Sequence, residues 1–340
     1  LRARQAISNA DSAHPFTIRN QALKTMKRKI RGVLTRGENY LAKNQPHLKL
    51  DYSGQAAGDL IRETLERGAP CMVCRFGKVE METLLTYLIT GKKFYPSKFL
   101  LSLKGGSFTW NERIRSSMSN NAGFFPTDEA SLAEFCRLYL ADMRQIDILG
   151  SWLHGEVAFS RYFDSAKIIP LSDIEPYYHE RPWSEVLSGK KVLLVSPFAR
   201  SIAQQFSENR TRLFANPNML PEFSLETLQA VQTIAGNGSN SGFADWFEAL
   251  SWMKEQIDSL DYDVVIVGAG AYGLPLAAHA KRTGKMAIHM GGATQILFGI
   301  KGKRWDGIPL IKSLYNEHWI NPSPEEIPEN FNKVEGGCYW

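Results

Sequence analysis

The strongest constraint on the fold is a strand, a glycine turn, a helix and a second strand that follow one another between residues 261 and 290. Residues 261–267 (DYDVVIV) form an apolar run with the length of a buried strand, and residues 285–290 (KMAIHM) resemble it. The turn 268–273 and the helical segment 274–282 lie between them. Two buried strands joined by a helix predict a parallel pair in an α/β sheet.

The same alternation occurs earlier in the chain. Residues 191–196 (KVLLVS) are typical of a buried parallel strand, and residues 201–208 of the helix after it. Further strands are expected at 71–74 and 147–150, and helices at 54–67, 79–89 and 128–143. We therefore expect an α/β fold with a Rossmann-like, doubly wound, mostly parallel sheet.

Three segments follow from this pattern. We expect a basic helical extension at residues 1–50 and a C-terminal tail at residues 316–340. Between them, residues 51–315 form the α/β catalytic domain, with halves at about 51–185 and 186–315.

The positive charge is confined to the first 50 residues, which hold 11 Lys and Arg against 2 acidic residues, whereas the other 290 hold 29 against 33. A nucleic-acid-binding protein would spread basic residues over its folded body, so no nucleic acid partner is expected. Residues 18–41 alternate apolar and basic side chains at helical spacing. This basic helix would either lie on an anionic membrane surface or bury its apolar stripe against the body.

Composition points to a reducing compartment. No apolar run approaches the roughly 18 residues that a membrane-spanning helix needs, and four cysteines are too few for a disulfide framework in 340 residues. No secretory signal is expected. We expect a cytoplasmic protein, peripheral at the inner face of the membrane if the basic helix binds lipid.

The turn after residue 267 matches the pattern G-x-G-x-x-G through Gly268, Gly270 and Gly273. Such glycines let the main chain and a helix N-terminus approach a phosphate group. The acidic residue that would hold a ribose about 20 positions further on is missing, so neither NAD nor FAD is expected. The turn binds a phosphate or nucleotide, or it serves only close helix–sheet packing.

A second glycine pair, Gly291 and Gly292, ends the next strand and precedes Lys301, Lys303 and Arg304. Three cations beside a strand end would neutralise a leaving diphosphate, and the neighbouring Trp305 offers a face for a base or a sugar ring. The alternative is a solvated basic loop.

Three further residues are candidates for catalysis. Glu80 stands early in a helix that follows a strand, where the helix dipole favours a carboxylate, and it would act as a base or as a metal ligand. Arg75 would pair with Glu80 or bind an anion. Glu156 follows another strand end and is a candidate base. The alternative for Glu80 is that it only stabilises the start of the helix.

Arg75-Phe76-Gly77-x-x-Glu80 resembles the R-F-G-D-G-E signature of GT-D type bacterial glycosyltransferases, and the ordered series of motifs resembles that family over about residues 52–315. The resemblance implies a nucleotide-sugar donor and a glycan or lipid-linked acceptor in surface-polysaccharide biosynthesis. It also implies a D-x-E motif that handles Mn²⁺ or Mg²⁺ and diphosphate. Lys78 stands where that motif has its first acid, which leaves Glu80 as the one matching metal ligand.

The sequence thus predicts a glycosyltransferase whose glycine turns and basic loop hold a donor diphosphate, with Glu80 at the reacting end. Two alternatives remain open at this point. One is a transferase of another activated group, such as a pyruvyl or phosphoglycosyl unit. The other is a non-catalytic nucleotide-sugar-binding scaffold, which the lysine at position 78 suggests.

Overall fold

The structure is a computed structural model that describes residues 47–91, 106, 107 and 109–340. The basic helix expected at residues 18–41 lies outside these residues. None of the helices in the described ranges is long and apolar enough to cross a membrane.

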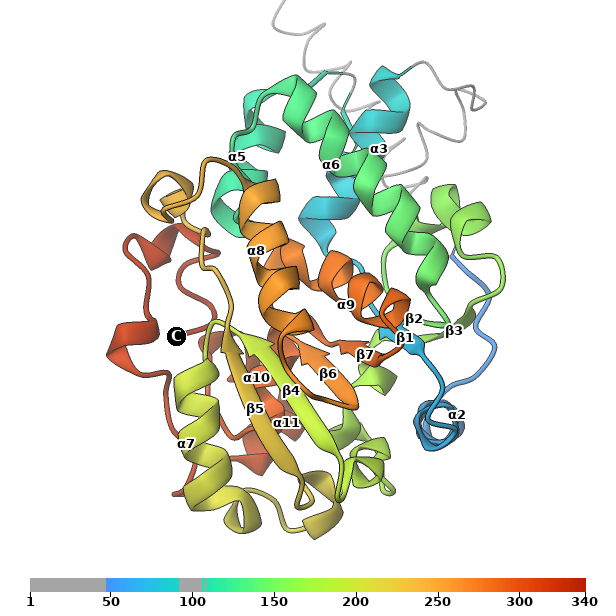
Figure 1. Cartoon of the computed structure of the whole chain (residues 1–340), viewed down its shortest axis with the longest axis vertical. Helices are drawn as coiled ribbons and strands as arrows, with labels where there is room; N and C mark the ends of the chain where they lie inside the picture. Colours follow the sequence, from blue (N-terminus) through green and yellow to red (C-terminus); the bar gives the residue numbers. More distant parts are fainter. Residues whose placement is uncertain (1–46, 92–105, 108) are drawn as a thin grey trace, which may run out of the picture. The chain divides into compact units, whose positions relative to one another are not determined.

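Seven parallel strands form one sheet in the described chain, in the order β3-β2-β1-β7-β6-β4-β5 (Figure 1). Their bounds are Cys71–Cys74 (β1), Ile148–Ser151 (β2), Lys167–Pro170 (β3), Lys191–Ser196 (β4), Ser224–Gln229 (β5), Val264–Val267 (β6) and Met286–His289 (β7). The two halves of the chain meet where β1 pairs with β7, with Val73 opposite Ile288. The predicted parallel α/β sheet is confirmed.

Helices cover both faces of the sheet (Figure 1). The helices on one face are α3 (Lys78–Thr90), α5 (Glu112–Asn121), α6 (Glu129–Asp142), α8 (Trp246–Asp258) and α9 (Gly273–Arg282). The helices on the other face are α2 (Gln55–Glu66), α7 (Ala199–Asn209), α10 (Thr294–Leu297) and α11 (Pro309–Leu314). Because side chains alternate along a strand, Met72 and Cys74 of β1 enter the first core and Val73 enters the second.

Two edge strands and four helices, α5, α8, α10 and α11, were not predicted. β5 is half exposed along its length, and β3 begins with the exposed Lys167 and ends with Pro170, so neither carries the continuous apolar run of a central strand. Helix α5 lies in a segment rich in Ser and Asn. The sequence feature that marks the start of this helix is its capping side chain. The side chain of Asn111 accepts a hydrogen bond from the main-chain N–H of Ile114 at 3.1 Å. Asp245 caps α8 in the same way through Glu248 N–H, at 2.8 Å.

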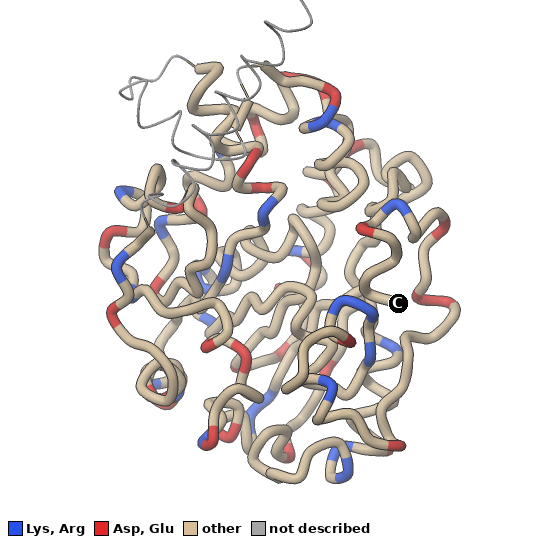
Figure 2. The backbone as a smooth tube through the Cα atoms, turned by 180° about the vertical axis from the view of Figure 1, so that it is seen from behind, with Lys and Arg blue, Asp and Glu red and all other residues tan. Residues whose placement is uncertain are grey.

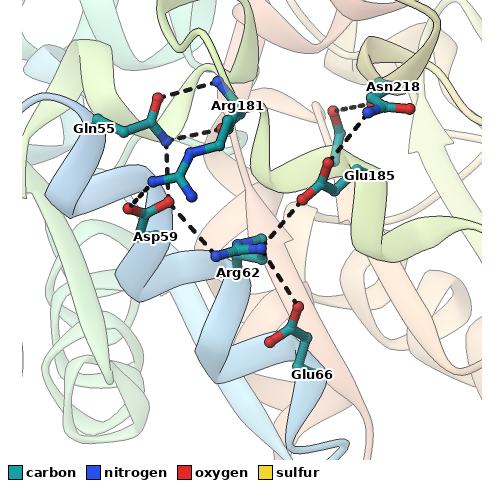
Figure 3. Close-up of polar contacts among 8 residues, drawn as sticks. Gln55, Asp59, Arg62, Glu66, Arg181, Glu185 and Asn218 are labelled. Atoms are coloured by element: carbon teal, nitrogen blue, oxygen red, sulfur yellow. Dashed lines mark hydrogen bonds and ion pairs between the residues drawn. The ribbon is translucent and has the colours of Figure 1, made fainter.

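Helix α2 is joined to the segment around residues 181–185 by a group of polar side chains (Figure 3). Arg181 pairs with Asp59 at 2.8 Å, and Arg62 reaches Glu185 at 3.3 Å. The side-chain amide of Gln55 donates to the carbonyl of Arg181 at 2.9 Å. These contacts fix the connection between β3 and β4 against the body of the domain.

The segment predicted as a C-terminal tail also contacts the body. Glu326 accepts hydrogen bonds from the main-chain N–H groups of Arg200 and Ser201, at 2.9 and 3.1 Å, at the start of α7. Further along, the N–H of Arg304 donates to the carbonyl of Cys338 at 2.9 Å. Residues 47–340 form one compact unit. Basic and acidic residues are interspersed over this unit in the view of Figure 2.

Candidate functional site

A cavity of about 500 Å³ opens at the carboxyl edge of the sheet. The residue that follows each of the seven strands lines it: Arg75 after β1, Trp152 after β2, Leu171 after β3, Pro197 after β4, Ala230 after β5, Gly268 after β6 and Met290 after β7. β4 and β6 are neighbours in the sheet. The connection after β4 leads to β5 on one side of this pair, and the connection after β6 leads to β7 on the other side. Ligands of open α/β sheets bind at such a switch point, outside the carboxyl ends of the strands.

Arg75 is the central cation of this cavity. Its guanidinium lies 5.1 Å from the ring centre of Trp152, and Nη1 lies 3.2 Å from the position that a Cβ on Gly291 would take. Within the described chain it makes no hydrogen bond or ion pair, and Nε is buried without a partner. A buried donor without an acceptor is unfavourable, and an anion bound in the cavity would supply one. The guanidinium is therefore poised to bind a ligand anion.

Glu80 lies at the start of α3 with its carboxylate folded back over Gly77. A Cβ on Gly77 would lie 1.8 Å from one carboxylate oxygen, so a side chain at this position would displace the carboxylate from its place over the turn. Glu80 is 8% exposed and lines the cavity. Burial raises the pKa of its carboxyl, while its own main-chain N–H and Arg75 act in the opposite direction. Lys78, two residues earlier, is exposed and lines the same cavity.

In the first glycine turn, residues 268–273, two glycines allow close packing and the third has a positive φ at the cavity. A Cβ on Gly268 would lie 2.8 Å from the carbonyl oxygen of Gly291, so the ends of β6 and β7 need this glycine to approach each other. Gly273 does not line the cavity but lies against the ring of His289. Gly270 lines the cavity with a positive φ of 54°, which favours glycine. Helix α9 begins beside this turn, with its N-terminus toward the cavity wall.

His289 is the buried imidazole of the site. Its Nδ1 lies 3.2 Å from the carbonyl oxygen of Val267, which only accepts, so Nδ1 carries the proton and Nε2 is left as an acceptor. Burial and the nearby Arg75 lower the pKa of His289 to about 3. The ring is therefore neutral at physiological pH.

The predicted basic loop is only partly at the site. Gly291, Gly292 and Arg304 line the cavity, but Lys301 and Lys303 do not. Lys303 is exposed, and Lys301 lies 5.7 Å from the ring centre of Tyr315. Trp305 is buried, lines the cavity and contacts Tyr339, so the exposed face expected for a base is not available.

Glu156 is buried and does not line the cavity. Its carboxylate accepts hydrogen bonds from the hydroxyl of Ser151 and from the main-chain N–H of Trp152. Burial raises the pKa of Glu156 to about 7, and these hydrogen bonds act against that rise. The residue braces the turn that presents Trp152 to the cavity.

Three parts of the site were not predicted: Glu175, the C-terminal segment, and residues 230–234 after the edge strand β5. Glu175 lines the cavity, and no motif surrounds it. Contacts of its neighbours fix its place. Trp183 donates to the carbonyl of Ile174 at 2.7 Å, and the N–H of Gly54, from a distant part of the sequence, donates to the side chain of Asp173 at 2.6 Å. The second part is the C-terminal segment. The lining residues from this segment are Val334, Glu335, Tyr339 and Trp340.

Tyr339 connects the C-terminal segment to the predicted basic loop. Its hydroxyl accepts a hydrogen bond from Arg304 at 2.9 Å, and its ring fills the space where a Cβ on Gly292 would lie. The guanidinium of Arg304 also pairs with Glu335. Arg304 is thus held at the cavity by residues more than thirty positions away in the sequence. The aromatic cluster of the last residues is the one sequence signal for this contact.

The donor set does not fit a metal centre held by the protein. Divalent cations such as Mn²⁺ and Mg²⁺ take several oxygen ligands, often from more than one carboxylate. In the parts of the chain that the structure describes, no three His, Cys, Asp or Glu side chains come together to hold a metal ion. Arg75 acts on the Glu80 carboxyl as a nearby positive charge, and that charge opposes the binding of a divalent cation there.

Residues 175–297 match the GT-D fold-like domain. This match includes the two glycine turns but not Arg75 and Glu80. No curated protein matches the chain. Among solved structures, the chain is similar to a selenomethionine-substituted domain of unknown function, DUF1792. That similarity has 12% identity and a TM-score of 0.33, and it covers 75% of this chain and 82% of the other.

Proposed function

We propose that this chain is a glycosyltransferase that takes its sugar from a nucleotide-sugar donor. The match of residues 175–297 to the GT-D fold-like domain supports this proposal. The acceptor in this proposal is a sugar hydroxyl of a glycan or of a lipid-linked glycan, of the kind built in bacterial surface-polysaccharide biosynthesis.

The observation that carries the proposal is the unpaired guanidinium of Arg75. It lies beside the Gly291 turn in a cavity at the switch point of the sheet, where an anion would satisfy its free donors. The N-termini of α3 and α9 begin at the same cavity, and helix N-termini favour negative charge. A diphosphate is the anion that the proposal places there.

In this proposal the bond between the anomeric carbon and the diphosphate oxygen breaks, and the leaving diphosphate keeps the electron pair. Arg75 stabilises the negative charge that develops on that oxygen. Glu80 lies within the same segment and receives the proton of the acceptor hydroxyl as the new glycosidic bond forms. Burial raises the pKa of its carboxyl, which makes Glu80 a stronger base than an exposed glutamate.

The first test is a thermal-melt panel of nucleoside diphosphates and nucleotide sugars, with and without Mn²⁺. A ligand that binds only the native state raises the melting temperature by mass action. We expect a selective rise for one nucleotide series without the metal. No rise for any member of the panel, in folded protein, would contradict the proposal.

The second test measures transfer and donor hydrolysis with the bound nucleotide sugar. Glu80→Gln should abolish turnover while nucleotide binding and the melting temperature stay close to the wild type. Glu82→Gln on the same helix is the matched control and should keep activity, because Glu82 pairs with Arg113. Full turnover by Glu80→Gln would remove Glu80 from the mechanism.

A scaffold that binds nucleotide sugars without catalysis is the second candidate. Lys78 favours it, because this lysine occupies the place of an acid in the resembled motif. Hydrolysis of the donor in the absence of an acceptor separates the two, since a scaffold leaves the donor intact.

The membrane contact proposed for residues 18–41 concerns a segment outside the described structure. Flotation with anionic vesicles, with and without residues 1–45, tests it. Equal binding of the two proteins would contradict it.

A further inference from the structure

The cavity walls differ along the order of the strands. Over β4 and β5 the lining is mostly apolar, with Pro197, Phe198 and Val231. Over β6 and β7 it consists largely of the two glycine turns. Over β1, β2 and β3 it holds an exposed tryptophan, Trp152, and a second carboxylate, Glu175. Adjacent strands lie about 4.8 Å apart, so β2 and β3 extend the cavity by roughly 10 Å beyond β1.

Trp152 is unusual among the large side chains of the cavity because 39% of its surface is exposed. Its indole N–H donates to the carbonyl of Phe76 at 2.9 Å, and Arg75 lies 5.1 Å from its ring centre. The ring is therefore fixed in place while much of its apolar surface stays open. A fixed aromatic side chain with a polar tip and an open apolar body is a common contact surface for ligands that are part apolar and part polar.

Glu175 supplies the polar partner at this end. One of its carboxylate oxygens accepts the hydroxyl of Tyr177, and the other has no protein partner within the described residues. Contacts on both sides hold its loop, so the carboxylate is preorganised. Burial raises the pKa of Glu175 to about 7, with Tyr177 and Arg75 acting against that rise. Near neutral pH it therefore has both a charged form that accepts a hydroxyl and a neutral form.

We propose that Trp152 and Glu175 form the acceptor subsite, in which the indole carries the face of a sugar ring and the free carboxylate oxygen binds one of its hydroxyls. This inference rests on the proposed function and adds to it the place and the chemical class of the acceptor. The diphosphate beside Arg75 separates this subsite from the apolar lining over β4 and β5, where the nucleoside would lie.

Saturation-transfer difference NMR tests the subsite with a panel of methyl hexosides, methyl 6-deoxyhexosides and methyl N-acetylhexosaminides. Each glycoside is measured alone and with the nucleoside diphosphate that raises the melting temperature most. We expect at least one glycoside to receive saturation from the protein and to keep its signal when the nucleoside diphosphate is bound.

Five variants assign that signal. Trp152→Ala should remove it, and Trp152→Phe should restore much of it, because phenylalanine keeps an aromatic face. Trp252→Ala is the matched control, since Trp252 is 37% exposed on α8 and does not line the cavity. Glu175→Gln should lower the apparent affinity for the glycoside about tenfold. Glu180→Gln changes an exposed neighbour and should leave that affinity unchanged.

The outcomes separate the two proposals. Absence of nucleoside diphosphate binding contradicts the proposed function, whatever the glycosides do. With the diphosphate bound, no signal from any glycoside, or an equal signal from wild type and Trp152→Ala, overturns the acceptor subsite alone. Displacement of the glycoside by the free nucleoside would also overturn it, because Trp152 would then bind the base.

Discussion

A Cβ on Gly273 would lie 2.0 Å from Cε1 of His289, so the last glycine of the turn is required by an imidazole and not by a phosphate. The ring is buried, neutral and hydrogen-bonded to Val267. Glycine at this position lets helix α9 begin directly against the end of β7. The motif G-x-G-x-x-G is thus explained here in part by the packing of a helix on the sheet.

This relationship predicts a specific double-mutant cycle. Gly273→Ala should lower the free energy of unfolding by about 1–3 kcal/mol through overpacking. In the His289→Ala background the same change should cost much less, because the ring that the new methyl group meets is gone. Urea unfolding of the four proteins measures the coupling. Equal costs in both backgrounds would show that the contact does not decide the residue at position 273.

Glu156 should make stability depend on pH. Its carboxyl has a pKa of about 7 in the folded protein against 4.5 ordinarily, so the native state binds more protons than the unfolded state between these values. The free energy of unfolding therefore falls as the pH rises through that window, by up to about 3 kcal/mol. Glutamine keeps the hydrogen-bonding shape and does not titrate.

Thermal melts of Glu156→Gln and wild type at pH 5 and pH 8 check this expectation. The variant should gain stability relative to the wild type at pH 8. A difference between the two proteins that is the same at both pH values would contradict it.

Glu326 should hold the C-terminal segment to the body. Its carboxylate accepts two main-chain N–H groups at the start of α7 and the hydroxyl of Ser201, and Glu326→Ala leaves those donors unpaired. We expect a loss of about 1–3 kcal/mol in stability. The neighbouring Glu325→Ala removes an exposed carboxylate and should cost less than about 1 kcal/mol.

Denaturant unfolding gives both values, and limited proteolysis of the segment around residues 321–340 gives an independent reading. Similar behaviour of the two variants would show that the contact with α7 contributes little.

The basic loop provides a prediction that separates its three cations. Arg304→Ala should weaken nucleoside diphosphate binding, because Arg304 lines the cavity, whereas Lys301→Ala and Lys303→Ala should not. Isothermal titration calorimetry on the three variants measures the affinities. A loss for Lys303→Ala as large as that for Arg304→Ala would restore the whole loop as a diphosphate site.

The sequence was most informative where one local pattern decides the outcome. The apolar runs of β1, β4, β6 and β7 are buried on both faces, so their strands and the parallel sheet could be predicted. Edge strand β5 pairs only with β4 and keeps polar residues, and its pattern gave no comparable signal.

The same distinction, between residues marked by a local pattern and residues placed by distant contacts, applies to the candidate site. Arg75, Glu80 and Gly270 follow strands or begin helices, and the carboxyl ends of parallel strands meet at one edge, so their common cavity could be anticipated. Glu175 is at the cavity because Gly54 holds the neighbouring Asp173, and Tyr339 is there because Arg304 donates to its hydroxyl; both partners are distant in the sequence. No spacing in the sequence records those contacts.

The central claim is that Arg75 binds the diphosphate of the donor. Isothermal titration calorimetry of the nucleoside diphosphate into wild type, Arg75→Ala and Arg67→Ala tests it most directly. Arg67 is an exposed arginine that follows α2, on the amino side of β1, and serves as the control for lost charge. We predict a loss of about 10- to 100-fold in affinity for Arg75→Ala and none for Arg67→Ala. Unchanged affinity in Arg75→Ala would contradict the account.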